Sequence, residues 1–506
     1  MAHARALVGL SSPRVTVETH LPGGLPGFTL VGLPETAVRE ARDRVKSAIQ
    51  NCGLDYPRGR VVVNLAPAEL SKDGARFDLA IAVSVLRATG QVPRNSALNL
   101  EFVGELGLFG ELRATRGCLC AALALVNDDP GGRSRLILPA ASAMEMGTAC
   151  PDRLLAATHL REVVAFLRDP EAQPLPSVAD LPATPRIHTP TEPGLEEVIG
   201  QEAAKRALTI AAAGGHHLLM IGPPGTGKTL LSRRLATLLP DLEQDQAMEV
   251  AAVYSAAGAA PPPPGRPPFR DPHHSASAPA LVGGGRDAMP GEISMAHHGV
   301  LMLDELPLFK PSVLDLLREP LESRTITVAR ARYRTTFPAA FQLVAAMNPC
   351  PAGFVCTEGS CRCAPEQVRR YRARVSGPLL DRIDLHVPVM PPSEALASVL
   401  DPPKTTHPGQ PTADAQAAVR QARDRQRQRQ GCSNAALAGP AVVGAANLDA
   451  GARRLLARAE SGFGLSLRGM HRVLRTARTV ADLAGAARVG SDHVAEALSY
   501  RAASTM

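Results

Sequence analysis

The stretch "HHLLMIGPPGTGKTLLSRRLA", His216 to Ala236, decides the fold of the middle part of the chain. A short apolar run leads into a glycine-rich turn, and a lysine, a threonine and a segment with helical periodicity follow. The turn fits the pattern G-x-x-x-x-G-K-[ST], in which backbone N–H groups and the N-terminus of the next helix face phosphate groups. The stretch therefore predicts a nucleotide-binding loop between a strand and a helix of a parallel α/β sheet.

Two side chains of this loop have specific expected roles. Lys228 is expected to reach the β- and γ-phosphates, and the Thr229 hydroxyl is expected to hold Mg²⁺. The alternative, a chance glycine turn, is disfavoured by the apolar strand "HLLMI" in front of it. The expected nucleotide-binding residues of the loop are Gly222, Pro223, Pro224, Gly225, Thr226, Gly227, Lys228, Thr229 and Leu230.

Two further strand-like runs end in polar residues. "GVLMLDELPLF" runs into Asp304 and Glu305, which are expected to hold Mg²⁺ through water and to polarise the attacking water, respectively. "FQLVAAMNP" ends at Asn348, whose amide can orient the same water. Helix capping or turn formation before Pro349 is the alternative role for this asparagine.

The order and spacing of these motifs resemble those of AAA+ ATPases. Longer segments resemble the magnesium-chelatase-like branch and, within it, the ComM (YifB) family: "FRDPHHSASAPALVGGG", "PGEISMAHHGVLMLDELP", "LREPLESRTITVARA" and "SGPLLDRIDLHV". The resemblance extends over almost the whole chain. It implies an α/β P-loop core, an N-terminal α+β domain like domain 2 of ribosomal protein S5, and a C-terminal helical lid. It also implies ATP and Mg²⁺ as cofactors and a ring oligomer, expected to be a hexamer.

The resemblance assigns roles to four residues outside the loop. Arg382 in "LLDRIDL" matches the arginine finger that reaches the γ-phosphate of a neighbouring subunit, with an ion pair to nearby Asp381 or Asp384 as the alternative. Arg468 in "LSLRGMHRVL" matches the sensor arginine of the lid, with a solvated helix arginine as the alternative. Ile199 and Gly200 match the segment that packs near the adenine.

Two proline-rich stretches divide the chain into three parts. Residues 169–194 and 391–411 are predicted to be linkers. The domains that they separate span residues 1–168, 195–390 and 412–506. The last part reads as a series of helices.

The first domain resembles the Lon-type proteolytic domain in "NLAPAELSKDGARFDLAIAV" and "FVGELGLFGELRATRGCLCAALAL". Peptide hydrolysis in that domain needs a serine activated by a lysine. Aligned with that pattern, Arg76 stands at the serine position and Leu119 at the lysine position. The domain is therefore expected not to be proteolytic.

Two insertions in the core are expected to form hairpins in the central pore of a ring. The segment "FRDPHHSASAPALVGGGRDAMPGEIS" resembles the helix-two insert of the branch, and "RTITVARARYRTTFP" predicts a second hairpin. Arg330 and Arg332 lie near its turn and are candidate DNA contacts, because basic side chains can grip a phosphate backbone. They can equally be exposed turn residues.

The net charge of +7 resides in the C-terminal part, where residues 404–506 contain fifteen Lys and Arg against seven Asp and Glu.

Four cysteines lie within "CPAGFVCTEGSCRC", directly after Asn348. Four thiolates at this spacing can wrap one tetrahedral Zn²⁺, and free reduced thiols are the alternative. The related cluster of the ComM family commonly begins Cys-Pro-Cys, whereas Ala352 stands at the third position here. The candidate zinc ligands are Cys350, Cys356, Cys361 and Cys363.

Two pairs of adjacent histidines also occur, His273–His274 and His297–His298. Neighbouring side chains of a strand point to opposite faces, so each pair is expected to be poorly placed to bind one metal ion.

The expected function is an ATP-driven ring motor on DNA, because ComM proteins are branch-migration helicases that act during recombination and natural transformation. Single-stranded or branched DNA is the expected partner. The chain contains no run of eighteen apolar residues and no signal-peptide core, so we expect a cytoplasmic protein without a membrane span. Alternative functions are a chelatase-type or protein-remodelling ATPase and an ATP-dependent protease.

Overall fold

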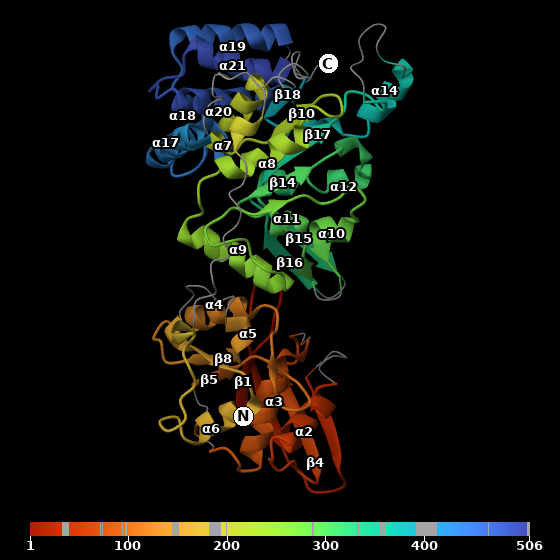
Figure 1. Cartoon of the computed structure of the whole chain (residues 1–506), viewed down its shortest axis with the longest axis vertical. Coiled ribbons are helices and arrows are strands. Elements are labelled where there is room, and N and C mark those ends of the chain that lie inside the picture. Colours follow the sequence, from red (N-terminus) through yellow and green to blue (C-terminus); the bar gives the residue numbers. More distant parts are fainter. Residues whose placement is uncertain are drawn as a thin grey trace.

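The computed structural model describes most of the chain, and its domains follow one another along the long axis of the molecule. The described residues are 1–32, 40–70, 72, 74–93, 95–96, 99–143, 151–181, 194–198, 200–285, 288–330, 333–353, 361, 363–390, 412–463 and 465–502. Figure 1 shows a first domain at one end, a core domain in the middle and a helical domain at the other end.

The first domain is built on a mixed sheet with the strand order β3-β4-β2-β1-β5-β8-β9. β2 runs antiparallel to β1 and β4, and the other neighbouring pairs are parallel. β4 covers Arg60–Ala66, and its side chains alternate between buried and more exposed positions. The strands of the sheet are β1 (Ala2–Arg5), β2 (Arg14–His20), β3 (Gly27–Val31), β4, β5 (Leu100–Phe102), β8 (Arg135–Pro139) and β9 (Leu154–Ala157).

The helices of the first domain cover this sheet. α3 (Asp78–Ala88) is buried over almost its whole length, while α2 (Ala41–Asn51) and α6 (Leu160–Arg168) each bury one apolar face. The remaining elements are the short hairpin β6 (Glu105–Leu106) and β7 (Leu112–Arg113), and the helices α4 (Cys118–Asp128) and α5 (Ala140–Ala143).

The core domain contains a parallel sheet with the strand order β11-β14-β17-β10-β18. All six residues of β17 are buried, as expected for a central strand covered on both faces. The three strands predicted from the nucleotide-site motifs are β10, β14 and β17, and they lie side by side. The strands are β10 (Leu218–Ile221), β11 (Phe269–Arg270), β14 (Val300–Leu303), β17 (Gln342–Met347) and β18 (Leu385–Pro388). The helices around them are α7 (Glu202–Gly214), α8 (Lys228–Leu238), α9 (Gln244–Ala257), α12 (Pro311–Asp315), α13 (Pro320–Ser323), α14 (Pro365–Arg372) and α15 (Gly377–Leu380).

Two hairpins extend from the core, as the insertions predict. β15 (Thr325–Arg330) pairs antiparallel with β16 (Tyr333–Pro338), and β12 (Gly283–Gly284) pairs with β13 (Met289–Pro290). β12 contacts β15, so the two hairpins lie together. The short helices α10 (Ala278–Val282) and α11 (Glu292–Met295) flank the β12–β13 hairpin. Arg330 ends β15, whereas Arg332 lies outside the described residues.

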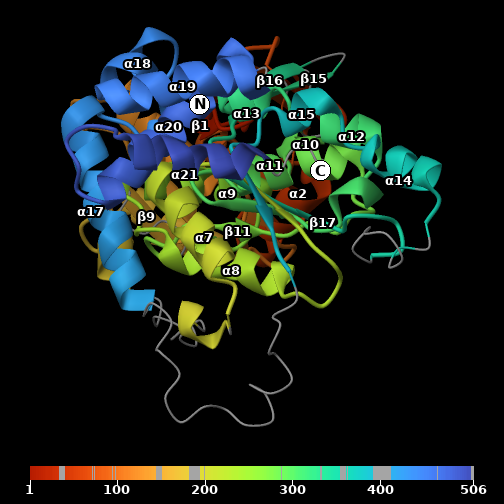
Figure 2. The same ribbon diagram turned by 90° about the horizontal axis from the view of Figure 1, so that it is seen from above.

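The helical domain packs against one side of the core, with α14 on the opposite side of the molecule (Figure 2). α17 and α20 contact α7, and α21 contacts β18. The helices predicted in the last part of the chain are therefore present. They are α17 (Thr412–Gln430), α18 (Pro440–Ala446), α19 (Ala450–Phe463), α20 (Leu467–Leu483) and α21 (Ser491–Ala502). Within the described residues, no helix combines the length and the apolar character needed to cross a membrane.

The first predicted linker is partly ordered against the first domain. Ala156 N–H donates a hydrogen bond to Pro176 O at 2.9 Å, and Leu155 and Ser177 form an isolated β-bridge. Leu175 is buried in the core of the first domain. Residues 169–181 therefore belong to the folded unit, while 182–193 and the second predicted linker, 391–411, lie outside the described residues.

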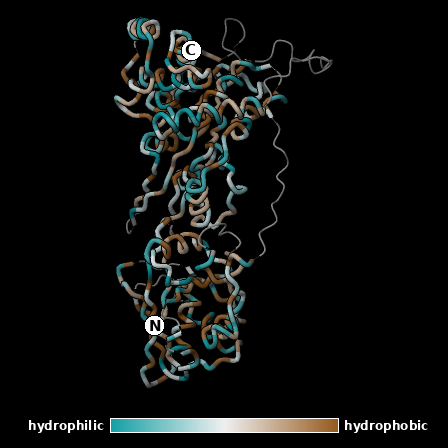
Figure 3. Tube along the Cα trace, turned by 90° about the vertical axis from the view of Figure 1, so that its left-hand side faces the viewer, coloured by the Kyte–Doolittle hydropathy of each residue, from teal (hydrophilic) through white to brown (hydrophobic). Residues whose placement is uncertain are grey.

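The first domain meets the core through α4 and α9, at the narrow junction visible in Figure 3. Gly117, the N-cap residue of α4, has no side chain to cap the helix. Ser255 of α9 takes this role instead, because its carbonyl oxygen accepts from Gly117 N–H at 2.7 Å and its hydroxyl accepts from Leu119 N–H at 3.2 Å. Ala252 and Ala256 of α9 pack beside this cap against α4.

We predict that Ser255→Ala loosens the start of α4. Loss of a capping hydroxyl costs about 1 kcal/mol, which makes hydrogen exchange of the first-turn amides of α4 about fivefold faster. Hydrogen–deuterium exchange mass spectrometry measures this, with Ser499→Ala as the control, because the exposed Ser499 hydroxyl donates to Glu496 O of its own helix. Equal protection of α4 in both variants contradicts the capping role.

Candidate functional site

The phosphate loop follows β10 and leads directly into α8, as the sequence predicts. Gly227 is the N-cap residue of α8 and has φ +85°, and open space lies where a Cβ would project. This backbone conformation favours glycine and turns the loop N–H groups outward ahead of the helix N-terminus. The loop therefore fits a phosphate group.

Lys228 and Asn348, predicted from separate motifs, are in contact. The Lys228 Nζ donates to Gly222 O at 2.8 Å, to Pro223 O at 2.7 Å and to Asn348 Oδ1 at 3.1 Å. Burial lowers the pKa of Lys228, and the nearby charges of Asp304 and Glu305 partly oppose that effect. The ammonium group is therefore held inside the loop, next to the tip of β17.

Thr229 and Asp304 also meet across the site. The Thr229 hydroxyl donates to Asp304 Oδ2 at 2.5 Å, which places two oxygen ligands of the kind that Mg²⁺ prefers side by side. Glu305 follows with φ +53°, and its side chain is half exposed. Its backbone N–H donates to Asp304 Oδ1 at 2.8 Å, which fixes the relative orientation of the two acids. The donor set fits Mg²⁺.

His274 is a site residue that the sequence reasoning missed. Its Nδ1 lies 3.6 Å from Glu305 Oε2, and both side chains are partly exposed. The signal was available, because His273 and His274 follow β11 closely, and β11 pairs in parallel with β14, the strand that precedes Glu305. Residues after neighbouring parallel strands meet at the same sheet edge.

Arg382 lies at the opposite edge of the sheet from the phosphate loop. It precedes β18, whose Leu385 is in register with Leu218 at the start of β10, whereas Gly222 follows the end of β10. A strand of four residues spans about 13 Å, so the two groups are separated by at least the length of the strand. Arg382 pairs with Glu322 at 2.9 Å rather than with Asp381 or Asp384.

Arg468 lies near Arg382 rather than near the phosphate loop of its own chain. Its Nη2 is 4.0 Å from the Glu322 oxygen that Arg382 contacts, and its side chain is 75% exposed. The predicted finger and the predicted lid sensor therefore share one carboxylate at the amino edge of the sheet.

The segment predicted near the adenine is only partly described. Gly200 is exposed and Ile199 lies outside the described residues. The next residue, Gln201, donates from Nε2 to Met390 O at 2.5 Å, which places this segment beside the carboxyl end of β18. That is the sheet edge that also holds the phosphate loop.

The cysteine segment lies against the phosphate loop. Cys350 is buried, and its Sγ is 3.6 Å from Cys361 Sγ. The Cys363 backbone N–H donates to Cys361 Sγ, and the sulfurs of these three residues lie within 4.8 Å of one another. Cys356 lies outside the described residues. In the same segment, a Cβ added at Gly353 would lie 2.8 Å from Pro224 Cδ of the phosphate loop.

The expectation that His297 and His298 face opposite ways is wrong, because they lie in a turn rather than a strand. His298 has φ +57°, and the Nε2 atoms of both rings lie within 3.0 Å of Glu249 Oε2. The His297 Nδ1 accepts from Ala340 N–H, so its ring proton is on Nε2 and points at Glu249. That tautomer leaves Nε2 without a lone pair for a metal, and the group is a hydrogen-bonded cluster.

We predict that Gly353→Ala weakens nucleotide binding. The new Cβ collides with Pro224, and the φ of +79° is costly for alanine, so the phosphate loop has to shift. Titration with a fluorescent ATP analogue should show Kd rising by about tenfold, which corresponds to about 1.4 kcal/mol. Gly90→Ala is the matched control, because Gly90 has φ +75° and nothing within 4 Å of its Cβ position. Unchanged affinity in Gly353→Ala contradicts the contact.

We predict that His297 makes the protein sensitive to acid. Burial lowers the pKa of His297 to about 4, whereas an unfolded histidine titrates near 6.5. Between these values only the unfolded chain binds the proton, so the unfolding free energy decreases as the pH falls from 6.5 to 4, by up to about 1.4 kcal/mol per pH unit from this group. Urea unfolding at several pH values gives the unfolding free energy as a function of pH. The slope of this plot below pH 6.5 should be shallower for His297→Gln than for wild type. The exposed His20→Gln should keep the wild-type slope.

Three family models cover the chain in order. Residues 17–142 match "Subunit ChlI of Mg-chelatase", residues 194–396 match "Magnesium chelatase, subunit ChlI", and residues 409–501 match "Magnesium chelatase, subunit ChlI C-terminal". The matched regions correspond to the first, core and helical domains.

Relatives that match over nearly their whole length are also found. The chain is 45% identical to the uncharacterized protein YifB of Escherichia coli K12 over 504 residues, and 44% identical to the competence protein ComM of Haemophilus influenzae over 506 residues. Each match covers 99% of this chain and 97% of the relative. The magnesium-chelatase 38 kDa subunit of Rhodobacter capsulatus is 28% identical over 338 residues, covering 60% of this chain and 86% of that subunit. With three consecutive family models and near-complete coverage at this identity, the chain belongs to the ComM/YifB family of magnesium-chelatase-like AAA+ proteins.

Proposed function

We propose that the chain is an ATP-driven ring motor that moves along DNA, a branch-migration helicase of recombination and natural transformation. The proposal of a ring rests on the position of Arg382, which lies at the opposite sheet edge from the phosphate loop of its own chain. An arginine finger in this position completes a hydrolysis site only on a neighbouring subunit, and a closed ring gives every subunit such a neighbour.

Hydrolysis then uses residues from both sheet edges. Lys228 binds the phosphates, and Thr229 and Asp304 hold Mg²⁺, which neutralises phosphate charge when bound. Glu305 polarises the attacking water, and Asn348 orients it. Arg382 of the adjoining subunit stabilises the charge that develops on the γ-phosphate.

The lid and the adenine segment complete the nucleotide contacts. Arg468 lies beside Arg382 through their common partner Glu322, so we assign both arginines to the same subunit interface. Ile199 and Gly200 are assigned to the adenine.

The assignment of DNA as the substrate has three supports. A relative that matches over 97% of its length is named a competence protein. Arg330 ends β15 of the β15–β16 hairpin, and Arg332 is the second residue after it in the sequence. The C-terminal part of the chain is basic, which suits a polyanionic partner.

We also propose that the cysteine segment binds a structural Zn²⁺. The sulfurs of Cys350, Cys361 and Cys363 are close enough to share one tetrahedral ion, and Cys356 is the proposed fourth ligand. The contact between Gly353 and Pro224 means that an ordered cysteine segment also supports the phosphate loop. Its role is therefore to hold the loop in place.

The motor function is tested by unwinding of branched DNA. We expect Lys228→Ala to lose nucleotide binding and unwinding, and Glu305→Gln to keep nucleotide binding but lose unwinding. Arg382→Ala should lower ATP turnover by about 10³-fold while binding nucleotide normally. ATP turnover is measured with and without single-stranded DNA. Stimulation by unfolded protein alone supports a remodelling ATPase instead, and equal unwinding by all variants refutes the motor.

The zinc site is tested by metal analysis of the purified protein. We expect mass spectrometry of the acid-digested protein to find one Zn²⁺ per chain. We also expect a lower melting temperature after the metal is removed by chelation. Cys350→Ser should lose the metal, whereas Cys432→Ser, outside the segment, should retain it. A metal-free wild-type protein that melts at the same temperature with and without added zinc contradicts the proposal.

A further inference from the structure

Arg76 is a buried arginine with which no described carboxylate is paired. It lies in the short helix η1 (Ala75–Phe77) of the first domain and is 4% exposed. Its Nη1 donates to Arg116 O at 3.4 Å, while its Nε and Nη2 are buried without a hydrogen-bond partner. Asp78, two residues further along the chain, is already paired with Arg44 at 2.7 Å. Arginine stays protonated in proteins, so within the described residues the charge of Arg76 is uncompensated.

The other buried arginines of the described residues lie beside groups that stabilise a cation. Arg87 donates to Met1 O and lies in the last turn of α3, where the negative end of the helix dipole favours a positive charge. Arg76 has no such compensation, and burial lowers its pKa, which reflects the free-energy cost of keeping the charge away from water. The remaining three form the ion pairs Arg5–Glu101, Arg234–Glu197 and Arg478–Asp482.

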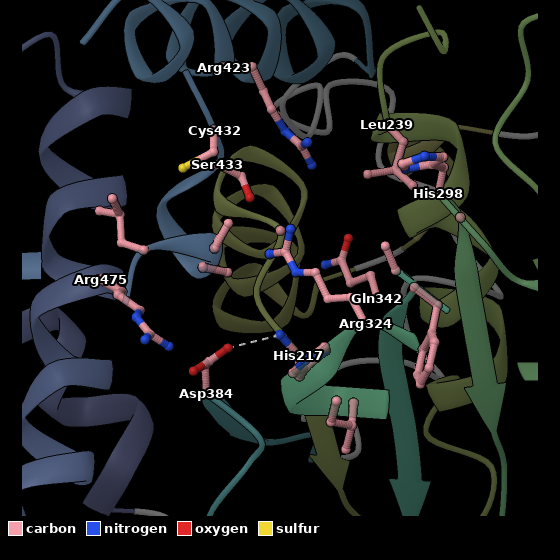
Figure 4. Close-up of a pocket in the computed structure, with 18 of the residues that line it drawn as sticks. His217, Leu239, His298, Arg324, Gln342, Asp384, Arg423, Cys432, Ser433 and Arg475 are labelled. Carbon is pink, nitrogen blue, oxygen red and sulfur yellow. Dashed lines mark hydrogen bonds between the residues drawn. The ribbon is translucent and has the colours of Figure 1, made fainter. Parts of the chain in front are cut away.

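Arginines also gather around a cavity between the core and helical domains, but that cluster belongs to the amino edge of the core sheet. Figure 4 shows Arg324, Arg423 and Arg475 around this cavity, with the carboxylate of Asp384 among them. The predicted finger and the predicted lid sensor line it as well, so it is part of the proposed subunit interface. Arg76 lies in a different domain and contacts none of these groups.

Two thiols of α4 lie close to Arg76 but do not neutralise it. Cys118 and Cys120 are both buried. The Cys118 Sγ donates to Thr115 O at 3.1 Å, and the Cys120 Sγ donates to Ala252 O at 3.5 Å. A thiol that donates to a carbonyl oxygen keeps its proton and carries no charge. Burial also raises the pKa of Cys120 to about 12, which keeps this thiol neutral at physiological pH.

The N-terminus of α4 meets the Arg76 guanidinium at the same place. α4 has 11 residues, and Ser255 accepts from two of the N–H groups at its start. The N–H groups of Cys118 and Cys120 have no hydrogen bond to another described residue. Arg116 O, which accepts from Arg76, belongs to the second residue before Cys118. A helix N-terminus carries partial positive charge, so it repels a buried cation unless an anion lies between them.

We propose that a small monovalent inorganic anion, of the class of chloride, binds between the Arg76 guanidinium and the first turn of α4. Its ligands are the Nε and Nη2 groups of Arg76 and the backbone N–H groups of Cys118 and Cys120. Water can accept from the same donors, but only an anion also neutralises the charge. Because the surrounding side chains, such as those of Phe77 and Leu119, are buried, the ligand has to be small.

The site lies where the first domain meets the core. The same turn of α4 is capped by Ser255 of α9, and the Cys120 thiol contacts the backbone of α9 at Ala252. In the Lon-type pattern this place holds the catalytic pair, whereas here Arg76 and Leu119 stand at the two positions. The anion is therefore a structural ligand that stabilises the junction, and the inference needs neither ATP nor DNA.

The first measurement compares chloride with gluconate, an anion too large for the site. Hydrogen–deuterium exchange of the α4 amides in wild type is followed while chloride replaces gluconate at constant ionic strength. An anion that binds only the folded site slows exchange through opening by one plus the ratio of its concentration to its Kd. We therefore expect a saturable response that reaches about tenfold when chloride is at about ten times its Kd.

Arg76→Met removes the charge and keeps much of the side-chain volume. We expect exchange in this variant not to respond to chloride, and to be no faster in gluconate than in wild type, because no buried charge is left to compensate. Arg87→Met is the matched control, since Arg87 is also buried in the first domain without a carboxylate partner. This control should keep the wild-type response. Equal circular dichroism spectra show that both variants fold.

The second measurement needs no variant. Bromide replaces chloride and scatters X-rays anomalously, so wild-type crystals soaked in sodium bromide should show an anomalous peak within hydrogen-bonding distance of the Arg76 guanidinium. A chloride response that Arg76→Met loses and Arg87→Met keeps supports the site. Equal exchange of wild type in chloride and gluconate overturns the proposal, and so does a chloride response that persists in Arg76→Met. If Arg76→Met does not fold, the presence or absence of the bromide peak decides.

Discussion

The parallel register between β10 and β18 is the constraint on which the functional geometry depends. It sets the phosphate loop after one end of β10 and Arg382 before β18 at the other end, so the body of the sheet stands between them. A single chain can hold phosphates at one edge and present arginines at the other, but it cannot bring the two together. The requirement for an adjoining subunit, which we propose, is therefore a consequence of strand order and not of any one interface residue.

The carboxyl edge of the sheet was largely predictable from the sequence because its chemistry is local. Each motif there is a short apolar strand followed at once by the polar group, so a linear pattern gives both the element and the residue, as for Lys228 and Asp304. Parallel pairing of β10, β14 and β17 then brings these groups together. His274 was missed because its partner Glu305 follows a different strand, and only the pairing of β11 with β14 makes them neighbours.

The amino edge was much less predictable, because its groups converge from distant segments. Arg324, Arg423 and Arg475 come from the core hairpin and two lid helices, and no short pattern links them. The resemblance named Arg382 and Arg468 at this edge, and for Arg472 and Arg475 the local signal was the spacing of the α20 arginines. The prediction for His297 and His298 was wrong for a different reason. It assumed a strand, but a positive φ at His298 turns both rings toward Glu249. The prediction that the first linker begins at residue 169 was wrong at its start. The proline-rich composition indicated a linker, but tertiary contacts bury Leu175 in the first domain.

The two edges also differ in which domains supply their polar groups, and this bears on how a motor can work. The phosphate loop is braced by β17, by Asn348 and by the cysteine segment, so its geometry is set before nucleotide binds. The arginines at the other edge are divided between the core, which supplies Arg382, and the helical domain, where α20 alone supplies Arg468, Arg472 and Arg475. Because these three share one helix, a shift of α20 would move all of them together. On the proposed function, the nucleotide of one subunit therefore sets the lid position of the next, which is the coupling that a sequential ring needs.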